Sequence, residues 1–237
     1  MSAPADRAPL AGLSIVLPVL DEAAGIIAAL QPLQAWRTQG AEVLVVDGGS
    51  RDGTPALAAP FADSVLLARR GRGAQMNAGA NAATGCLFLF LHADTRLPPE
   101  ARPALAGVLA GPSACWGRFD VRIEGNHRLL PLVAALMNFR SAITGITTGD
   151  QAMFVTRELF DRVGGFEDVP LMEDIRLSRA LRALVWPRRE RCRVTTSGRR
   201  WEQRGALRTV LLMWALRLLH AAGMPPQRLA RWYAAVR

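Results

Sequence analysis

The stretch Glu42-Val43-Leu44-Val45-Val46-Asp47-Gly48-Gly49-Ser50 decides the fold class of this chain. Its first half is an almost uninterrupted apolar run, which is typical of a strand buried on both faces of a parallel sheet. A carboxylate, two glycines and a serine follow directly, which predicts a turn at the carboxyl end of that strand. Open parallel sheets bind their ligands beyond the carboxyl ends of the strands, so this turn is the first candidate for a site.

Similar short apolar runs occur on both sides of this strand and alternate with helical patterns. Pro32 interrupts the helical pattern at 26–36 and must bend or divide it. Strands that alternate with helices predict a parallel sheet with right-handed crossovers. We expect further strands at 14–17, 64–68, 86–91, 116–124 and 152–155, and helices at 26–36, 74–83, 129–143, 157–163 and 173–184.

The length of 237 residues suits one compact α/β domain with a short appendage. We predict a domain of mostly parallel sheet flanked by helices over residues 12–205. A tail rich in Ala and Pro at 1–11 is expected to be disordered, and a helical segment is expected at 206–237.

The composition is basic, with a net charge of +9 and no lysine, so that all 29 basic residues are arginine. This excess indicates either a generally basic surface or an anionic partner such as a phosphate, a diphosphate or an anionic lipid. The three cysteines form no CxxC pair, which favours a reducing, cytoplasmic setting over a disulfide framework or a zinc site. We recognise no signal peptide, and the apolar run at 209–216 is too short to span a bilayer.

Three predicted strands end in polar residues that would share one edge of the sheet. The first runs into Pro18, Asp21 and Glu22, and the second runs into Asp47, Gly49 and Ser50. The third ends at His92-Ala93-Asp94. Asp47 has two interpretations: turn chemistry, or a carboxylate that accepts hydrogen bonds from a nucleobase or ribose.

His92 and Asp94 are the candidate metal ligands. Mg²⁺ is usually held by one or two carboxylates together with substrate phosphates, and Mn²⁺ also accepts imidazole. The alternative for His92 is a half-buried histidine with its hydrogen bonds satisfied within the protein.

Two further segments carry charge at predicted helix starts. Arg69-Arg70-Gly71-Arg72-Gly73 would hold a diphosphate or form a solvated basic turn. Glu173-Asp174 would supply a general base for an acceptor hydroxyl or would only complement the helix dipole. A dinucleotide fingerprint and a P-loop are both absent from the sequence, the latter because the chain has no lysine.

Taken together, these segments resemble glycosyltransferase family 2, a group of inverting enzymes with the nucleotide-binding GT-A fold. The resemblance covers most of residues 13–205, and its motifs occur in the order of the family. They are 15–18 with 21–22, 45–50 with 52–54, 71–73 with Asn77 and Gly79, 92–94, 149–150, 173–174, and Arg200-Trp201.

The resemblance implies metal-assisted single displacement from a UDP- or GDP-sugar to an unidentified acceptor hydroxyl. Asp174, with Glu173 beside it, would be the general base, and Asp94 and His92 would bind Mg²⁺ or Mn²⁺. Asp150, Gln151 and Trp201 would shape the acceptor or sugar pocket. The implied donor-binding residues are Pro18, Asp21, Glu22, Asp47, Gly49, Ser50, Arg72, Asn77, His92 and Asp94.

A narrower likeness is to a bacterial subgroup named for arsenosugar biosynthesis and for association with radical-SAM proteins, through 91–95, 149–152 and 171–174. Two positions depart from the family pattern. His92 stands where the family has the first Asp of its metal motif. Ser197 stands where processive members have Gln, so we expect a non-processive enzyme.

Three alternatives remain from the sequence. A nucleotidyltransferase that makes nucleotide sugars would be expected to have a Lys-containing phosphate loop, which this chain lacks. A nucleic-acid-binding module would want aromatic platforms, whereas this chain has one Tyr.

The C-terminal segment would either pack on the domain or lie in a membrane interface through Arg and Trp anchors. In the latter case the protein would be peripheral at the inner face of the membrane, with polyprenyl phosphate as acceptor.

Overall fold

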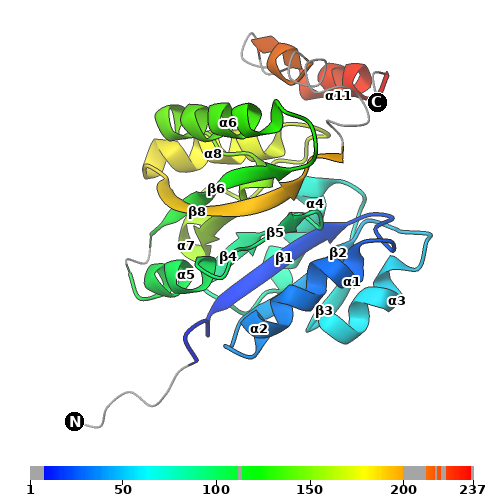
Figure 1. Ribbon diagram of the computed structural model, residues 1–237, viewed down its shortest axis with the longest axis vertical. Coiled ribbons are helices and arrows are strands. Elements are labelled where there is room, and N and C mark those ends of the chain that lie inside the picture. The colour runs from blue at the N-terminus through cyan, green and yellow to red at the C-terminus, as the bar shows by residue number, and fades with distance from the viewer. Residues whose placement is uncertain (1–7, 112–113, 200–211, 217, 220–222, 236–237) are drawn as a thin grey trace.

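A computed structural model describes residues 8–111, 114–199, 212–216, 218–219 and 223–235. In this part of the chain a single eight-stranded sheet, in the order β3-β2-β1-β4-β7-β6-β8-β5, lies between helices (Figure 1). The expected α/β class is therefore confirmed. The strands are β1 (Leu13–Val19), β2 (Glu42–Asp47), β3 (Ser64–Leu67), β4 (Leu87–Phe90), β5 (Thr95–Arg96), β6 (Trp116–Glu124), β7 (Met153–Thr156) and β8 (Arg188–Ser197).

The helices follow the predicted alternation through most of the chain. Pro32 divides the segment predicted at 26–36 into two short helices joined by a 3₁₀ turn, because proline has no N–H to donate within a helix. The helices are α1 (Ile26–Leu30), α2 (Gln34–Arg37), α3 (Thr54–Ala58), α4 (Arg72–Ala82), α5 (Ala101–Leu109), α6 (Leu130–Thr144), α7 (Arg157–Arg162), α8 (Glu173–Leu184) and α11 (Pro226–Ala235), with 3₁₀ turns at Gln31–Leu33, Ala59–Phe61 and Gly149–Gln151.

The sheet is mixed: β7 in its middle runs against both of its neighbours, and β5 at its edge runs against β8. Strands β3, β2, β1 and β4 are mutually parallel, whereas β7 runs antiparallel to both β4 and β6. Phe90, the last residue of β4, pairs with Met153, the first residue of β7. The loop that leaves β4 and the turn that enters β7 therefore meet at one edge of the sheet.

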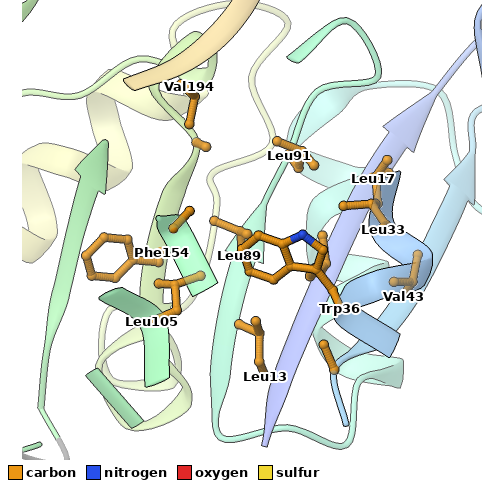
Figure 2. Close-up of a cluster of buried hydrophobic side chains, with 14 of the residues drawn as sticks. Leu13, Leu17, Leu33, Trp36, Val43, Leu89, Leu91, Leu105, Phe154 and Val194 are labelled. Atoms are coloured by element: carbon orange, nitrogen blue, oxygen red, sulfur yellow. The ribbon is translucent and has the colours of Figure 1, made fainter. Parts of the chain in front are cut away.

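Side chains of the inner strands are buried on both faces of the sheet, as the apolar runs predict. Along β1, Leu13, Ile15 and Leu17 belong to one core cluster, and Val16 belongs to the cluster on the other face. Figure 2 shows the first cluster, in which Trp36 packs beside Leu89. Full burial of each large side chain contributes about 1.5–3 kcal/mol, so these two layers hold the sheet and its helices together.

Helix α4 lies unusually close to the sheet because residue 79 is glycine. A Cβ atom at Gly79 would come closer than 3.0 Å to side-chain atoms of Val16 and Val46. One turn earlier, Gln75 is buried, and its Nε2 donates to the carbonyl oxygens of Val19 and Val46, each at 2.8 Å. This amide ties the carboxyl ends of β1 and β2 together under the helix.

The described domain begins earlier than the predicted boundary at residue 12. Leu10 is fully buried in the core, and its N–H donates to the Gln39 carbonyl at 2.9 Å. Residues 8–11 therefore do not belong to a disordered tail, and residues 1–7 of the predicted tail lie outside the described residues.

The described C-terminal residues are mostly helical: residues 212–216 and 218–219 are helical, and α11 follows them, and we call these the C-terminal helices. Leu216 and Leu229 are buried against Met172 and Ile175, next to the beginning of α8. Within the described parts of the chain, we find no helix long and apolar enough to cross a bilayer.

Candidate active site

Loops that carry the predicted site residues come from distant parts of the sequence and lie at one edge of the sheet. The carboxyl ends of β1, β2, β4, β6 and β8 lie there, together with the turn before β7. The Ser197 N–H at the end of β8 donates to the Asp94 carbonyl at 3.1 Å, which joins β8 to the loop after β4. The sheet thus assembles the predicted segments into one site.

The loops after β1 and β2 are fastened to each other. The Asp21 N–H donates to Ser50 Oγ at 2.8 Å, and Asp21 Oδ1 accepts from the Arg51 N–H at 2.9 Å. The Glu22 N–H donates to Thr54 Oγ1 at 2.8 Å. Asp21 has a φ of 53°, a left-handed conformation that these contacts help to hold. The two predicted nucleotide loops therefore form one preorganised surface.

Asp47 is buried and organises the turn that follows β2. Its Oδ2 accepts from the N–H groups of Gly49 and Ser50, each at 2.9 Å, and its Oδ1 accepts from the Ser50 hydroxyl. Gly49 has a φ of +92°, which a side chain would strain. These contacts are those of the turn interpretation, and contact of Asp47 with a nucleoside stays a prediction.

Two other residues predicted to bind the donor make contacts within the protein. Pro18 lies within β1, opposite Val46. The Asn77 amide clamps a loop instead of facing open space: Nδ2 donates to the Phe166 carbonyl at 2.8 Å and Oδ1 accepts from the Phe166 N–H at 2.9 Å. Asn77 therefore holds the loop before α8, and its contact with a donor stays a prediction.

A pocket brings together five of the predicted residues: Arg72, His92, Asp150, Glu173 and Asp174. His92 Nδ1 lies 3.6 Å from Asp150 Oδ1, and the imidazole packs directly on Gly149. The opposite wall is apolar and comes from α6 and the C-terminal helices, including Leu136, Met137, Met213, Trp214 and Leu216.

Asp174 is held by main-chain donors from two elements. Its Oδ2 accepts from the Gly149 N–H at 3.0 Å and its Oδ1 accepts from the Ile175 N–H at 2.7 Å. Met172, just before α8, has a φ of 70° although it is not glycine, a conformation that costs roughly 1–2 kcal/mol. The start of α8 is thus a strained, well-fixed support for the carboxylate.

Glu173 lies beside Asp174 but is almost completely buried. Burial raises the pKa of Glu173 above its ordinary value, and the nearby charge of Asp174 raises it further, while Arg72 and His92 act in the opposite direction. The pair therefore combines an almost completely buried carboxyl group, whose pKa is raised, with Asp174, which main-chain N–H groups hold at the pocket.

Arg72 links this pocket to the loop after β1. Burial raises the pKa of Glu22, the charge of Asp94 raises it further, and Arg199 and Arg72 oppose the shift. Arg72 also opposes the shift at Glu173. Arg72 is therefore within electrostatic range of both Glu22 and Glu173, and Glu22 is within range of Asp94.

The residues around Asp94 suit a hard divalent cation that also binds substrate phosphates. Asp94 is exposed at the end of the loop after β4, with Glu22 near it. Within the described ranges, no group of three His, Cys, Asp or Glu side chains is arranged to hold a metal without further ligands. One or two carboxylates with phosphate oxygens are a usual ligand set for Mg²⁺, so the fit depends on the donor.

The acceptor-pocket prediction needs one correction. Gln151 is fully buried and does not line the pocket; its Oε1 accepts from the Thr148 N–H at 3.3 Å and its Nε2 donates to Asn138 Oδ1 at 3.5 Å. The 3₁₀ turn at Gly149–Gln151 directs neighbouring side chains to opposite sides, so Asp150 faces the pocket and Gln151 the core. Trp201 lies outside the described residues.

Two arginines of the site were not predicted from the sequence. Arg199 follows β8 and acts electrostatically on Glu22, and Arg140 of α6 lines the pocket. The signal for Arg199 was its position two residues beyond a strand end, which was not visible because β8 itself was not predicted. Arg140 is the only charged residue of α6, a signal that the sequence does contain.

Comparison with known proteins gives a consistent family. The family described as "Glycosyl transferase family 2" matches residues 14–161. Among curated proteins, the undecaprenyl-phosphate 4-deoxy-4-formamido-L-arabinose transferase of Yersinia pestis is 33% identical over 111 residues. The match covers 42% of this chain and 34% of that protein, so the chain spans about a third of its relative.

Solved structures with the same fold cover more of the chain. A mannosyltransferase from Pyrobaculum calidifontis, in complex with GDP-Man and Mn²⁺, is 25% identical with a TM-score of 0.58, over 78% of this chain and 56% of that one. Glucosyl-3-phosphoglycerate synthase from Mycobacterium tuberculosis is 21% identical with a TM-score of 0.63, over 95% and 87% of the two chains. The latter likeness shows the fold alone.

Proposed function

The chain belongs to glycosyl transferase family 2, and from this premise we propose that it transfers a sugar from a nucleotide-diphosphate sugar to an acceptor hydroxyl. The observation that carries the proposal is the pocket in which Asp174, Asp150, His92 and Arg72 meet at the carboxyl edge of the sheet. A similar fold binds GDP-Man and Mn²⁺ in the mannosyltransferase, which supports a donor of this class.

The donor would lie across the joined loops after β1 and β2. Glu22, Asp21 and Asp47 would face or support the nucleoside. Arg72 and Arg199 would attract the diphosphate, since both lie within electrostatic range of Glu22. Asp94, with His92 as the second candidate ligand, would hold Mg²⁺ or Mn²⁺. When bound, such a cation neutralises the diphosphate charge and favours departure of the leaving group.

Asp174 would remove the proton from the acceptor hydroxyl. The two main-chain N–H groups fix this carboxylate against the pocket, so it can accept a proton without reorientation. Oxygen attack from the side opposite the nucleotide forms the new glycosidic bond as the bond to the diphosphate breaks, which inverts the anomeric centre. Glu173, which is buried beside Asp174, would help to hold the start of α8 in place.

The acceptor side has a second candidate, polyprenyl phosphate. The curated relative is named for transfer to undecaprenyl phosphate. Arg140 and the apolar wall of the pocket suit an anionic headgroup with an apolar chain. A phosphate oxygen needs no base at neutral pH, so turnover of Asp174→Asn with such an acceptor would identify this case. The nucleotidyltransferase alternative receives no support from the family match.

The test is a panel of UDP-, GDP- and other nucleotide sugars, with and without Mn²⁺. We expect one donor to raise the melting temperature in a Mn²⁺-dependent way and to be hydrolysed slowly to nucleoside diphosphate and free sugar. Formation of pyrophosphate or free nucleoside triphosphate from any substrate pair would instead identify a nucleotidyltransferase. Absence of binding and hydrolysis across the panel would contradict the proposed donor class.

A further inference from the structure

The outer face of α6 is apolar where a surface helix is normally polar. Leu129, just before the helix, and Leu132, Leu136, Phe139 and Ile143 within it are 39–64% exposed. Their spacing of three and four residues places them on one stripe. The opposite face, which includes Leu130 and Asn138, is buried, so the exposed apolar stripe is not the face by which α6 packs on the domain.

This apolar stripe reaches the mouth of the pocket. Leu136 belongs both to the stripe and to the pocket lining, and Trp214, which is 56% exposed, stands on the pocket wall contributed by the C-terminal helices. Leu218 and Trp232 are exposed on the same helices. Figure 1 shows α6 and the C-terminal helices at the same end of the molecule. We call the exposed apolar residues of α6 and of these helices the apical face.

Outside the pocket, the described segments that carry the apical face have arginine as their charged residues. Residues 125–149, 212–216, 218–219 and 223–235 contain four arginines and neither Asp nor Glu. Among the described arginines, Arg128 precedes α6, and Arg228 and Arg231 are exposed on α11 beside Trp232. Arg182 reaches the other end of α6 and donates to the Thr144 carbonyl at 2.5 Å.

We propose that the apical face binds the surface of an anionic lipid bilayer and opens the pocket toward it. An apolar stripe bordered by arginines and tryptophans suits the boundary between headgroups and acyl chains, where arginine stems can lie along apolar surface with their charge in the headgroups. Resting on the proposed function, the sugar acceptor is then a lipid-anchored molecule whose polar end enters the pocket between Leu136 and Trp214.

A bilayer explains the charge pattern better than a second copy of the chain does. Two apical faces brought together in a symmetric dimer would place their arginines near one another without intervening acids, which is unfavourable. Anionic headgroups instead attract each arginine near the surface, by about 1 kcal/mol. The apolar stripe and the arginines of these described segments thus favour the same partner.

The test is flotation of the full chain with two kinds of vesicle, phosphatidylcholine alone and phosphatidylcholine containing phosphatidylglycerol, at physiological salt. The test variant is Leu132→Ser with Phe139→Ser, which changes neither charge nor pocket lining. The control is Ile27→Ser with Leu67→Ser, which removes two exposed apolar side chains from α1 and β3. Thermal unfolding of both variants shows whether each is folded.

We expect the wild type and the control to float with the phosphatidylglycerol vesicles, and the test variant to bind about tenfold less or weaker still. A wild type that floats with neither vesicle, or a folded test variant that floats like the wild type, would overturn the proposal. If sedimentation shows that the wild type is a dimer and that the test variant is a monomer, then a second copy of the chain, and not a bilayer, covers the apical face. Donor hydrolysis measured without vesicles tests the proposed function separately, because hydrolysis does not require a bilayer.

Discussion

The main-chain N–H of Gly149 donates a hydrogen bond of 3.0 Å to Oδ2 of Asp174, although the two residues lie 25 positions apart in the chain. The bond joins the turn before β7 to the first turn of α8. The same turn supports His92 and Asp150. The predictions below follow from this junction and from the groups around it.

Asp174→Asn is expected to lower turnover about 10²- to 10⁴-fold, the contribution usual for a positioned general base. The amide can still accept from the Gly149 N–H, so donor affinity should stay near that of the wild type. Single-turnover transfer rates and calorimetric titration of the donor measure the two effects. Asp161→Asn, on α7 away from the pocket, is the matched control, and turnover of Asp174→Asn within threefold of that control would remove the base assignment for a hydroxyl acceptor.

Asp94→Ala is expected to weaken donor binding about 100-fold and to make the residual activity insensitive to added Mg²⁺ or Mn²⁺, since a divalent cation lends several kcal/mol to charge stabilisation. Activity titrated with each metal at fixed donor concentration tests this. Asp161→Ala serves again as the control for loss of one carboxylate. A variant that keeps the full metal response would show that the ion is held elsewhere.

Gly149→Ala is expected to destabilise the fold by about 1–3 kcal/mol, because the added Cβ would come closer than 3.0 Å to the His92 ring. Combination with His92→Ala should restore most of the lost stability by removing the ring. Gly107→Ala in α5, where nothing lies within 4 Å of the new Cβ, should stabilise by up to about 1 kcal/mol. Urea unfolding of the four proteins measures the cycle, and strictly additive effects at 92 and 149 would contradict the contact.

Glu173→Gln should change how stability depends on pH. Because burial raises the pKa of Glu173 in the folded state, its carboxyl group favours folding below its ordinary pKa of 4.5, and this contribution is lost as pH rises through the folded pKa. The variant has no such loss, so its unfolding free energy should gain on that of the wild type as pH is raised from 4 to 7.

Asp63→Asn provides a control of opposite sign. Burial alone would raise the pKa of Asp63, but hydrogen bonds from Arg37 and the Val43 N–H lower it below its ordinary value. Its contribution is present above the ordinary pKa of 3.8 and lost as pH falls, so Asp63→Asn should lose stability relative to the wild type as pH is raised. Parallel curves for the two variants would contradict both assignments.

The sequence predicted the bounds of strands and helices well where a single hydrophobic period was clear. The bounds expected for β6 and α8 are those of the structure, since period-2 and period-3.6 patterns are clear there. Strand β8 was not predicted, because five of its ten residues are charged. Its neighbours in space explain it: Asp120 of β6 accepts from Arg189 at 2.8 Å, and such a pairing is invisible in a local pattern.

The sequence predicted which loops form the site, but it did not predict which side chains of those loops face the pocket. The rule for parallel sheets brought His92, Asp94 and Asp47 to the correct edge. The same reasoning could not distinguish Asp150, which faces the pocket, from Gln151, which is buried beside it. It also could not show that Asn77 binds Phe166, 89 residues away.

The gathering of the site loops at one edge of the sheet leaves the opposite edge free for handling the protein. The turn at 185–187 between α8 and β8 lies there and carries the exposed Trp186. Helix α8 separates this turn from Asp174 by about 18 Å. A fluorescent dye or a surface tether attached at this turn would leave the pocket mouth open, so the protein could be oriented on a sensor chip while nucleotide sugars flow past.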